Sequence, residues 1–484
     1  MNQPIRRLSM VVAVMFVLLL VASTWIQVLG AQGIREASDN RRTQLDSYAR
    51  ERGQILLGGQ PIARSTEVED DLEWQRVYSD PELYSHVTGY FSFTYGSGAG
   101  LESASDGLLS GRDDQLFYDR LTDTIAGREP RGASLELTID PDAQQAAEQA
   151  LGEQRGAVVA LDPSTGDILA MVSHPNFDPS PLASHDVPTE RAAWERYTED
   201  ETQPMVNRAI GGNLYPPGST FKIVTAAAAL ESGDYSAGSS IPGPATLDLP
   251  QTTSDLPNAS GAACGANDQV TLAVAMQDSC NTAFGWLGME LGGDAVAEQA
   301  EAFGFGEELS VPMTVAPSTF PTGLNPPQEA QSAIGQYDVR TTPMQMAMVT
   351  AAVANDGVVM RPNMIEQVMA ADTSVIDEPE PDALRRAISS DTASELTDMM
   401  QLVTTDGTGT AGAVDGVSVA AKTGTAQHAE GAAPHAWYTA FAPADNPQVA
   451  VAVVVESGGT AGSEASGGSS AGPISKAVME AVLQ

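Results

Sequence analysis

The sequence Tyr215-Pro-Pro-Gly-Ser-Thr-Phe-Lys222 runs directly into Ile223-Val-Thr-Ala-Ala-Ala-Ala-Leu230. This second part is rich in alanine and is expected to form a helix that ends near Ser232. Ser219 would lie at the amino end of the helix, and Lys222 would follow three residues later on the same face of its first turn. The spacing therefore brings an amine close to a hydroxyl group.

A serine hydroxyl is a weak nucleophile until a base removes its proton, and a lysine kept neutral by burial can be that base. The free N–H groups at the start of the helix would also favour negative charge developing near Ser219. On its own, however, a serine three residues before a lysine is more often a helix cap beside an exposed lysine. Further motifs have to decide between these interpretations.

Two such motifs follow later in the chain. Ser279-Cys280-Asn281 comes after an apolar run over residues 270–277 and supplies a second hydroxyl and an amide. Lys422-Thr423-Gly424-Thr425 comes after small apolar residues that predict a strand, with a cation and hydroxyls at the sheet edge and a glycine that lets another backbone approach. Lysine occurs only at positions 222, 422 and 476. Two of these three lysines lie in the motifs, which favours a catalytic interpretation.

The order SxxK, SxN, KTG resembles the serine penicillin-binding and β-lactamase superfamily, and within it the class B penicillin-binding proteins of the penicillin-binding protein A type. Further similarity extends over nearly the whole chain, in Arg52-Gly-Gln-Ile55, Gly100-Leu-Glu102, Asp162-Pro-Ser-Thr-Gly166, Asn207-Arg-Ala209, Gly335-Gln336, Thr342-Pro-Met-Gln-Met-Ala347, Gly424-Thr-Ala-Gln427 and His435-Ala-Trp437. One departure is Leu56-Leu57, where the family usually continues with Asp-Arg.

The resemblance implies a role for each motif residue. Ser219 would be the acylated nucleophile and Lys222 its base, with Ser279 and Asn281 as proton relay and substrate contact. Lys422 and Thr423 would bind the substrate carboxylate and polarise the relay. The backbone N–H groups of Ser219 and Thr425, the latter just after Gly424, would form the oxyanion hole.

The implied reaction is that of a peptidoglycan D,D-transpeptidase. The serine attacks the D-Ala-D-Ala carbonyl of one stem peptide, D-Ala leaves, and an amine of a neighbouring stem resolves the acyl-enzyme. No cofactor or metal is expected, because the five histidines (86, 174, 185, 428 and 435) show no ligand spacing. The expected partners are stem peptides, glycan derived from lipid-linked precursors, β-lactam inhibitors, and a membrane glycosyltransferase of the shape, elongation, division and sporulation family.

Three alternatives stay open at this point. A β-lactamase or β-lactam sensor shares the motifs, and rapid penicillin hydrolysis instead of stable labelling of Ser219 would favour it. A D,D-carboxypeptidase uses water as acceptor, so only assays with donor and amine acceptor together separate it from a transpeptidase. A scaffold of the division or elongation machinery would have a dispensable site, and complementation by a Ser219→Ala variant would favour it.

The amino-terminal part predicts a membrane anchor. Residues 8–29 are almost all apolar, about the ~20 residues that a helix needs to cross a bilayer. Arg6 and Arg7 favour a cytoplasmic segment 1–7, a single spanning helix 8–30 and an extracytoplasmic remainder. A signal peptide cleaved near Val28 and Gly30 is the alternative, but the apolar run exceeds the usual ~7 to 15 residues of such signals.

The remainder predicts two regions. Residues 31–131 are polar, with glycine-rich patches and no long periodic helix, and resemble the family's non-catalytic pedestal as an irregular, extended domain. Residues 132–484 predict an α+β transpeptidase domain, an antiparallel sheet flanked by helices. Its expected strands are 135–139, 156–161, 168–173, 417–427, 436–442 and 448–457, and its expected terminal helices are 141–151, opened by Asp140 as a cap, and 473–483. Residues 458–472, rich in glycine and serine, predict a flexible loop.

Composition sets the outer bounds. A chain of 484 residues is long enough for two or three domains. Its net charge of −39 excludes electrostatic binding of nucleic acid, which needs clustered lysine and arginine side chains. Cys264 and Cys280 are the only cysteines; they could form a disulfide that ties down the loop entering the SxN motif, or stay as two small buried thiols.

Overall fold

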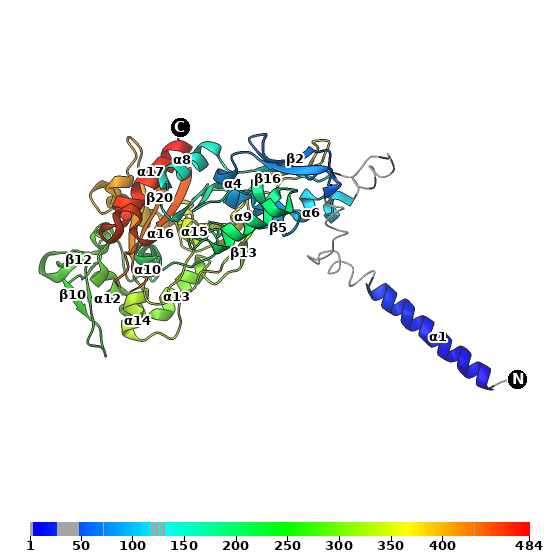
Figure 1. Cartoon of the computed structure of the whole chain (residues 1–484). Coiled ribbons are helices and arrows are strands. Elements are labelled where there is room, and N and C mark those ends of the chain that lie inside the picture. Colours follow the sequence, from blue (N-terminus) through cyan, green and yellow to red (C-terminus); the bar gives the residue numbers. More distant parts are fainter. Residues whose placement is uncertain are drawn as a thin grey trace.

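The computed structural model describes residues 3–26, 48–70, 72–117, 121, 125, 127, 131–429 and 431–484 (Figure 1). Its first helix is α1 (Gln3–Thr24), of which Ile5–Thr24 is long and apolar enough to cross a membrane and is not buried against the rest of the chain. The predicted span is thus helical, and the helix already includes Arg6 and Arg7. The last residues of that span and the alternative cleavage site at Val28 and Gly30 lie outside the described residues.

A five-stranded antiparallel sheet forms the centre of the carboxy-terminal part. Its order is β19 (Ala420–Ala426), β20 (His435–Ala442), β21 (Val449–Val455), β7 (Gly156–Leu161) and β8 (Ile168–His174). The prediction of one sheet assembled from distant parts of the chain is therefore confirmed, and β19, which carries the KTG motif, is its edge strand.

Helices cover both faces of this sheet, so its strands are apolar on both sides. Val158 and Ala160 face a cluster that includes α8 (Pro141–Leu151) and α17 (Gly472–Val482). The alternate residues Ala157 and Val159 face the main core, which includes α10 (Lys222–Glu231), α15 (Pro343–Ala354) and α16 (Ser390–Thr405). The α+β prediction is confirmed, and so are the two predicted helices that became α8 and α17. The predicted cap is also present, since the Asp140 carboxylate accepts from the N–H groups of Asp142 and Ala143.

A second, six-stranded sheet corrects the prediction of an irregular pedestal. Its order is β17 (Val375–Asp377), β16 (Ile365–Met369), β6 (Ser134–Leu137), β1 (Ile55–Leu57), β2 (Gln60–Glu67) and β3 (Trp74–Tyr78). The strand expected near residue 135 thus belongs to this sheet and not to the central one. Strands β1 and β3 were missed because they are only three and five residues long, and β2 was missed because burial along it does not alternate strictly. The sheet also joins segments from both sides of the domain boundary predicted at residue 131.

The predicted flexible loop over residues 458–472 was also wrong. Much of it forms short turns, η7 (Glu456–Glu464) and η8 (Gly467–Ala471), and Gly458, Gly459 and Gly462 in η7 have positive φ. Gly467 packs so closely on the KTG strand that a side-chain carbon there would lie 2.6 Å from the carbonyl oxygen of Gly424 and 2.1 Å from that of Trp437. Glycine permits this close backbone contact because it has no side chain. The composition did not predict the contact, because a segment rich in glycine and serine also resembles a flexible linker.

A buried cluster of charges holds the pedestal together. The Glu102 carboxylate accepts from Arg52 Nε and Arg76 Nε, both at 2.6 Å, and all three side chains are almost completely buried. Burial opposes ionisation of Glu102, but the charges and hydrogen bonds of Arg76 and Arg52 outweigh it and lower its pKa. Arg52 and Glu102 belong to the two pedestal segments that resemble the family.

We expect Glu102→Ala to destabilise the protein strongly, because it leaves two arginines buried without their shared counter-charge. The expected loss is about 3–5 kcal/mol of unfolding free energy. Asp382→Ala is the matched control, since Asp382 pairs with Arg361 at 2.8 Å while both side chains are about half exposed; its expected cost is at most about 1 kcal/mol. Urea unfolding of the full chain in detergent, followed by tryptophan fluorescence, measures both. Equal losses in the two variants would contradict the structural role of the cluster.

Candidate active site

Ser219 lies where sequence reasoning expected it, at the amino end of a helix. A 3-10 turn, η4 (Gly218–Phe221), continues directly into α10. Gly218 has φ +55°, and a side-chain carbon there would lie 3.0 Å from the carbonyl oxygen of Thr425. Glycine therefore allows the nucleophile turn to adopt this conformation directly beside the KTG strand.

Three contacts fix the turn that carries Ser219. The Gly218 N–H donates to the carbonyl oxygen of Gly335 at 2.9 Å. The Trp437 indole donates to the carbonyl oxygen of Pro216 at 3.1 Å, and the Thr220 hydroxyl donates to that of Pro217 at 2.8 Å. The turn is thus held by strand β20, by the loop before Gln336 and by its own side chain.

Lys222 is completely buried, and its amine points to the SxN motif. Its Nζ donates to Asn281 Oδ1 and to the Ser279 carbonyl oxygen, both at 2.7 Å, and lies 3.4 Å from Ser279 Oγ. Burial first, and then the neighbouring charge of Lys422, lower the pKa of Lys222 well below its usual value. The neutral amine that the sequence hypothesis requires is therefore favoured here.

Lys422 reaches the same hydroxyl from the edge strand. Its Nζ donates to Ser279 Oγ at 2.7 Å and to the Thr423 carbonyl oxygen at 3.0 Å. Burial lowers its pKa to about 7. Ser279 Oγ therefore lies between two lysine amines, which is the arrangement needed to pass a proton.

Ser219 and Lys222 are brought to one turn, but within the described residues Ser219 Oγ makes no hydrogen bond, including none to Lys222. Ser219 is partly exposed, whereas Lys222 is completely buried. A catalytic hydrogen bond of this kind often forms only when substrate binds. Thr425 is exposed at the end of the motif, and Gly424 packs against the carbonyl oxygen of Pro217, 3.0 Å from where its side chain would begin.

Two supporting contacts escaped the sequence interpretation. The Thr408 hydroxyl is hydrogen-bonded to the Thr423 hydroxyl at 2.6 Å; the only signal for it was the glycine-flanked segment Gly407-Thr-Gly409. Glu456, at the end of β21, accepts from the Tyr215 hydroxyl at 2.7 Å and from Arg208 Nε at 2.9 Å. This pair of bonds anchors the chain that leads into the nucleophile turn.

His435, one of the five histidines without ligand spacing, is buried at the start of β20, the strand that follows the KTG strand. Its Nδ1 accepts from the Ser457 N–H at 3.0 Å, and its ring stacks on His428 at 4.0 Å between centroids. Burial lowers its pKa to about 4. The ring is therefore neutral near pH 7 and serves as a structural acceptor.

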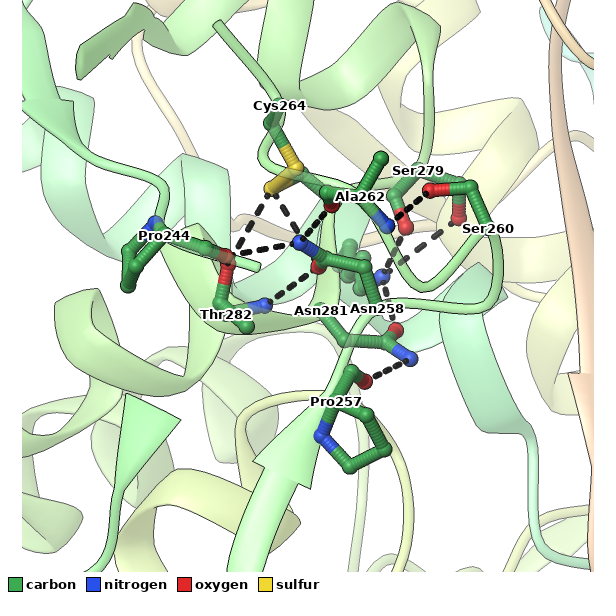
Figure 2. Close-up of a disulfide and its surroundings, with 11 residues drawn as sticks. Pro244, Pro257, Asn258, Ser260, Ala262, Cys264, Ser279, Asn281 and Thr282 are labelled. Atoms are coloured by element: carbon green, nitrogen blue, oxygen red, sulfur yellow. Dashed lines mark hydrogen bonds between the residues drawn. A yellow bond between two sulfur atoms is a disulfide. The ribbon is translucent and has the colours of Figure 1, made fainter. Parts of the chain in front are cut away.

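The two cysteines are joined. Cys264 and Cys280 form a disulfide across 16 residues, so of the two interpretations left open the structure has the bridge (Figure 2). Because Cys280 lies between Ser279 and Asn281, the bridge is attached to the SxN motif itself.

Comparison with known proteins agrees with this geometry. A family model described as the penicillin binding protein transpeptidase domain matches residues 156–480, and one described as the penicillin binding protein A dimerisation domain matches residues 52–135. The peptidoglycan D,D-transpeptidases PbpA of Mycolicibacterium smegmatis and Mycobacterium tuberculosis are 45% and 44% identical to this chain, over 100% of it and 99% of each relative. The ceftriaxone acyl-enzyme of M. tuberculosis penicillin-binding protein A superimposes with a TM-score of 0.87 at 43% identity, covering 91% of this chain and 100% of that one.

The chain belongs to the penicillin-binding protein transpeptidase family. Its full-length similarity to the PbpA enzymes confirms the more particular prediction of the penicillin-binding protein A type. The predictions of a serine-type acyltransferase and of a peptidoglycan D,D-transpeptidase are confirmed with it.

Proposed function

We propose that Ser219 is the residue through which this transpeptidase forms its acyl-enzyme, with Lys222 as the base. The observation that carries the proposal is the buried Lys222 amine, held 2.7 Å from Asn281 Oδ1 and one helical turn from Ser219. In the reaction, Ser219 Oγ bonds to the penultimate D-Ala carbonyl carbon as Lys222 accepts its proton. The amide C–N bond then breaks, and the proton returns to the nitrogen of the departing D-Ala.

Ser279 is the relay in this scheme. Its hydroxyl lies 3.4 Å from Lys222 Nζ and 2.7 Å from Lys422 Nζ, so it can take the proton from Lys222 and hand it to the leaving amine. Lys422 and Thr423 bind the terminal carboxylate of the donor, with Thr408 orienting the Thr423 hydroxyl. The N–H groups of Ser219 and Thr425 stabilise the oxyanion.

The acceptor distinguishes transpeptidation from hydrolysis. The relatives named above are D,D-transpeptidases, which supports an amine of a second stem peptide as the acceptor for this chain. Incubation with a D-Ala-D-Ala donor and a competing amine tests this. A cross-linked product at the expense of free acid supports transpeptidation, whereas hydrolysed donor alone, at every amine concentration, opposes it.

The two lysines predict a bell-shaped pH dependence of the second-order acylation rate constant. Neutral Lys222 is the active form, so the rate rises with pH as this lysine loses its proton, and its lowered pKa moves this limb to lower pH than for an ordinary lysine. Charged Lys422 is the carboxylate-binding form, so the rate falls as pH rises through about 7. Lys422→Arg, whose side chain stays charged, is expected to lose the alkaline limb. An unchanged limb in that variant would contradict the assignment.

The same shifts affect stability with a defined sign. The pKa of Lys422 is about 7 in the folded protein, below the usual lysine value of 10.5. Between these two values the unfolded chain binds more protons, so this lysine's contribution to stability rises with pH across that window and is least favourable below pH 7.

Outside the site, we propose a retained anchor with an extracytoplasmic catalytic part and a pedestal over residues 31–131 ahead of a catalytic domain over 132–484. The support is the apolar helix α1 and the two family matches. A membrane glycosyltransferase of the shape, elongation, division and sporulation family is the proposed partner. Protease digestion of intact spheroplasts tests the orientation, since resistance of the catalytic part would oppose it, and photo-crosslinking from α1 tests the partner.

A further inference from the structure

The SxN turn is held on one side by the end of helix α11 (Leu272–Gln277), where the N–H groups of Ser279 and Cys280 donate to the carbonyl oxygens of Met276 and Ala275 at 3.2 and 2.8 Å. Ser279 has φ +58°, a conformation that residues other than glycine rarely adopt. Helix α12 (Asn281–Leu291) starts directly after it, but its N-cap residue, Cys280, makes no side-chain capping bond because its sulfur is in the disulfide. The start of α12, which carries Asn281, therefore depends on a capping group from elsewhere in the chain.

Asn258 supplies those groups from the loop that precedes the motif. Its Oδ1 accepts from the N–H of Thr282, in the first turn of α12, at 3.0 Å. Its Nδ2 donates to the carbonyl oxygens of Pro244 and Ala262, both at 2.9 Å (Figure 2). Since carbonyl oxygens can only accept, this network fixes the orientation of the amide, and the side chain is only 6% exposed.

The loop around Asn258 also contacts the catalytic amide. Asn281 Nδ2 donates to the carbonyl oxygen of Pro257 at 3.3 Å, which turns its Oδ1 toward Lys222 Nζ. The disulfide from Cys264 attaches the far end of the same loop to the turn. The amide of Asn258 adds a second attachment, which fixes the start of α12 in register with the loop.

We propose that Asn258 is a positioning residue for catalysis, which caps α12 from outside and so holds Asn281 and Ser279 on the amine of Lys222. The proposal rests on the function assigned above to Lys222, Ser279 and Asn281. It adds to those motifs a residue that lies more than twenty positions before the SxN turn and has no motif of its own.

The test compares acylation of the full chain by benzylpenicillin in Asn258→Ala and Asn258→Asp. Alanine removes the cap and both donor bonds, so the second-order acylation rate constant is expected to fall about tenfold to hundredfold, the effect of a displacement near 1 Å. Aspartate keeps the oxygen that accepts from Thr282, so a smaller fall than in the alanine variant is expected. A fall is still expected, because its second oxygen cannot donate to the two carbonyl oxygens. If alanine prevents folding, the aspartate variant carries the test.

The matched control is Asn363→Ala. Asn363 also accepts one bond and donates two, with its Oδ1 accepting from the Ile365 N–H at 3.1 Å and its Nδ2 donating to the Ile365 carbonyl at 2.8 Å and to Asp167 Oδ1 at 3.3 Å. None of these bonds reaches the SxxK, SxN or KTG motif. A lowered melting temperature with normal acylation is expected there. The acid limb of the acylation profile is expected to shift in both Asn258 variants and not in the control, because only they alter the contacts of Lys222.

The outcomes separate two kinds of failure. Wild-type acylation on Ser219 together with wild-type rates and profiles in folded Asn258 variants would overturn the positioning role alone. Equal losses of acylation in Asn258→Ala and Asn363→Ala, in proportion to melting temperature, would also overturn it. A wild-type protein that is never acylated would instead overturn the proposed function on which this inference rests.

Discussion

Replacement of Ser219 by alanine is expected to abolish acylation and to lower transpeptidation on the order of 10⁴-fold or more. The loss follows because the hydroxyl is the only group at the start of α10 that forms the bond to the carbonyl carbon in the proposed mechanism. Fluorescent penicillin labelling of the full chain, read on a denaturing gel beside donor turnover, measures both effects.

Ser232→Ala is the matched control for that experiment. Ser232 lies just past the other end of the same helix, where its hydroxyl donates to the carbonyl oxygen of Ala229 at 2.7 Å and is remote from the motifs. Labelling and turnover are expected to stay at the wild-type level. Stable labelling of the Ser219→Ala variant would show that another nucleophile is used.

Replacement of Lys222 by methionine is expected to lower the acylation rate constant by about 10²- to 10⁴-fold, the usual contribution of a general base. Methionine has a similar length and no charge, so it fills the buried site without introducing a group that needs a counter-ion. Stopped-flow fluorescence with benzylpenicillin measures the rate, and the adduct that does form is still expected on Ser219.

Lys476→Met is the control, because Lys476 is the one lysine outside the motifs and pairs with Glu480 on the surface of α17 at 3.7 Å. Its acylation rate is expected to be unchanged. A Lys222→Met variant that is folded and is acylated as fast as the Lys476→Met variant would remove Lys222 from the mechanism.

The sequence predicted which motif side chains come together better than it predicted the framework. Three short motifs were enough to predict the meeting of Lys222, Ser279, Asn281 and Lys422, because chemistry restricts which residue types can occupy those positions. The central sheet was also predictable, since β7, β20 and β21 are continuous apolar runs bounded by turn residues.

The errors have physical causes as well. The pedestal strands β1 and β3 are three and five residues long, too short to show a period, and the sheet they belong to is completed by β16, which pairs with β6, and β17, which come from much later in the chain. Asn258 and Thr408 act through side-chain hydrogen bonds to segments that lie elsewhere in the sequence. Apart from the glycines on either side of Thr408, a pattern along the chain gives no signal for such contacts.

Peptide mapping by tandem mass spectrometry after treatment of the wild-type chain with benzylpenicillin tests the central claim most directly. We predict one penicilloyl adduct, on the hydroxyl of Ser219, formed faster as rising pH neutralises the amine of Lys222. A protein that stays unmodified under these conditions, or an adduct on any other residue, would contradict the assignment of Ser219 as the nucleophile.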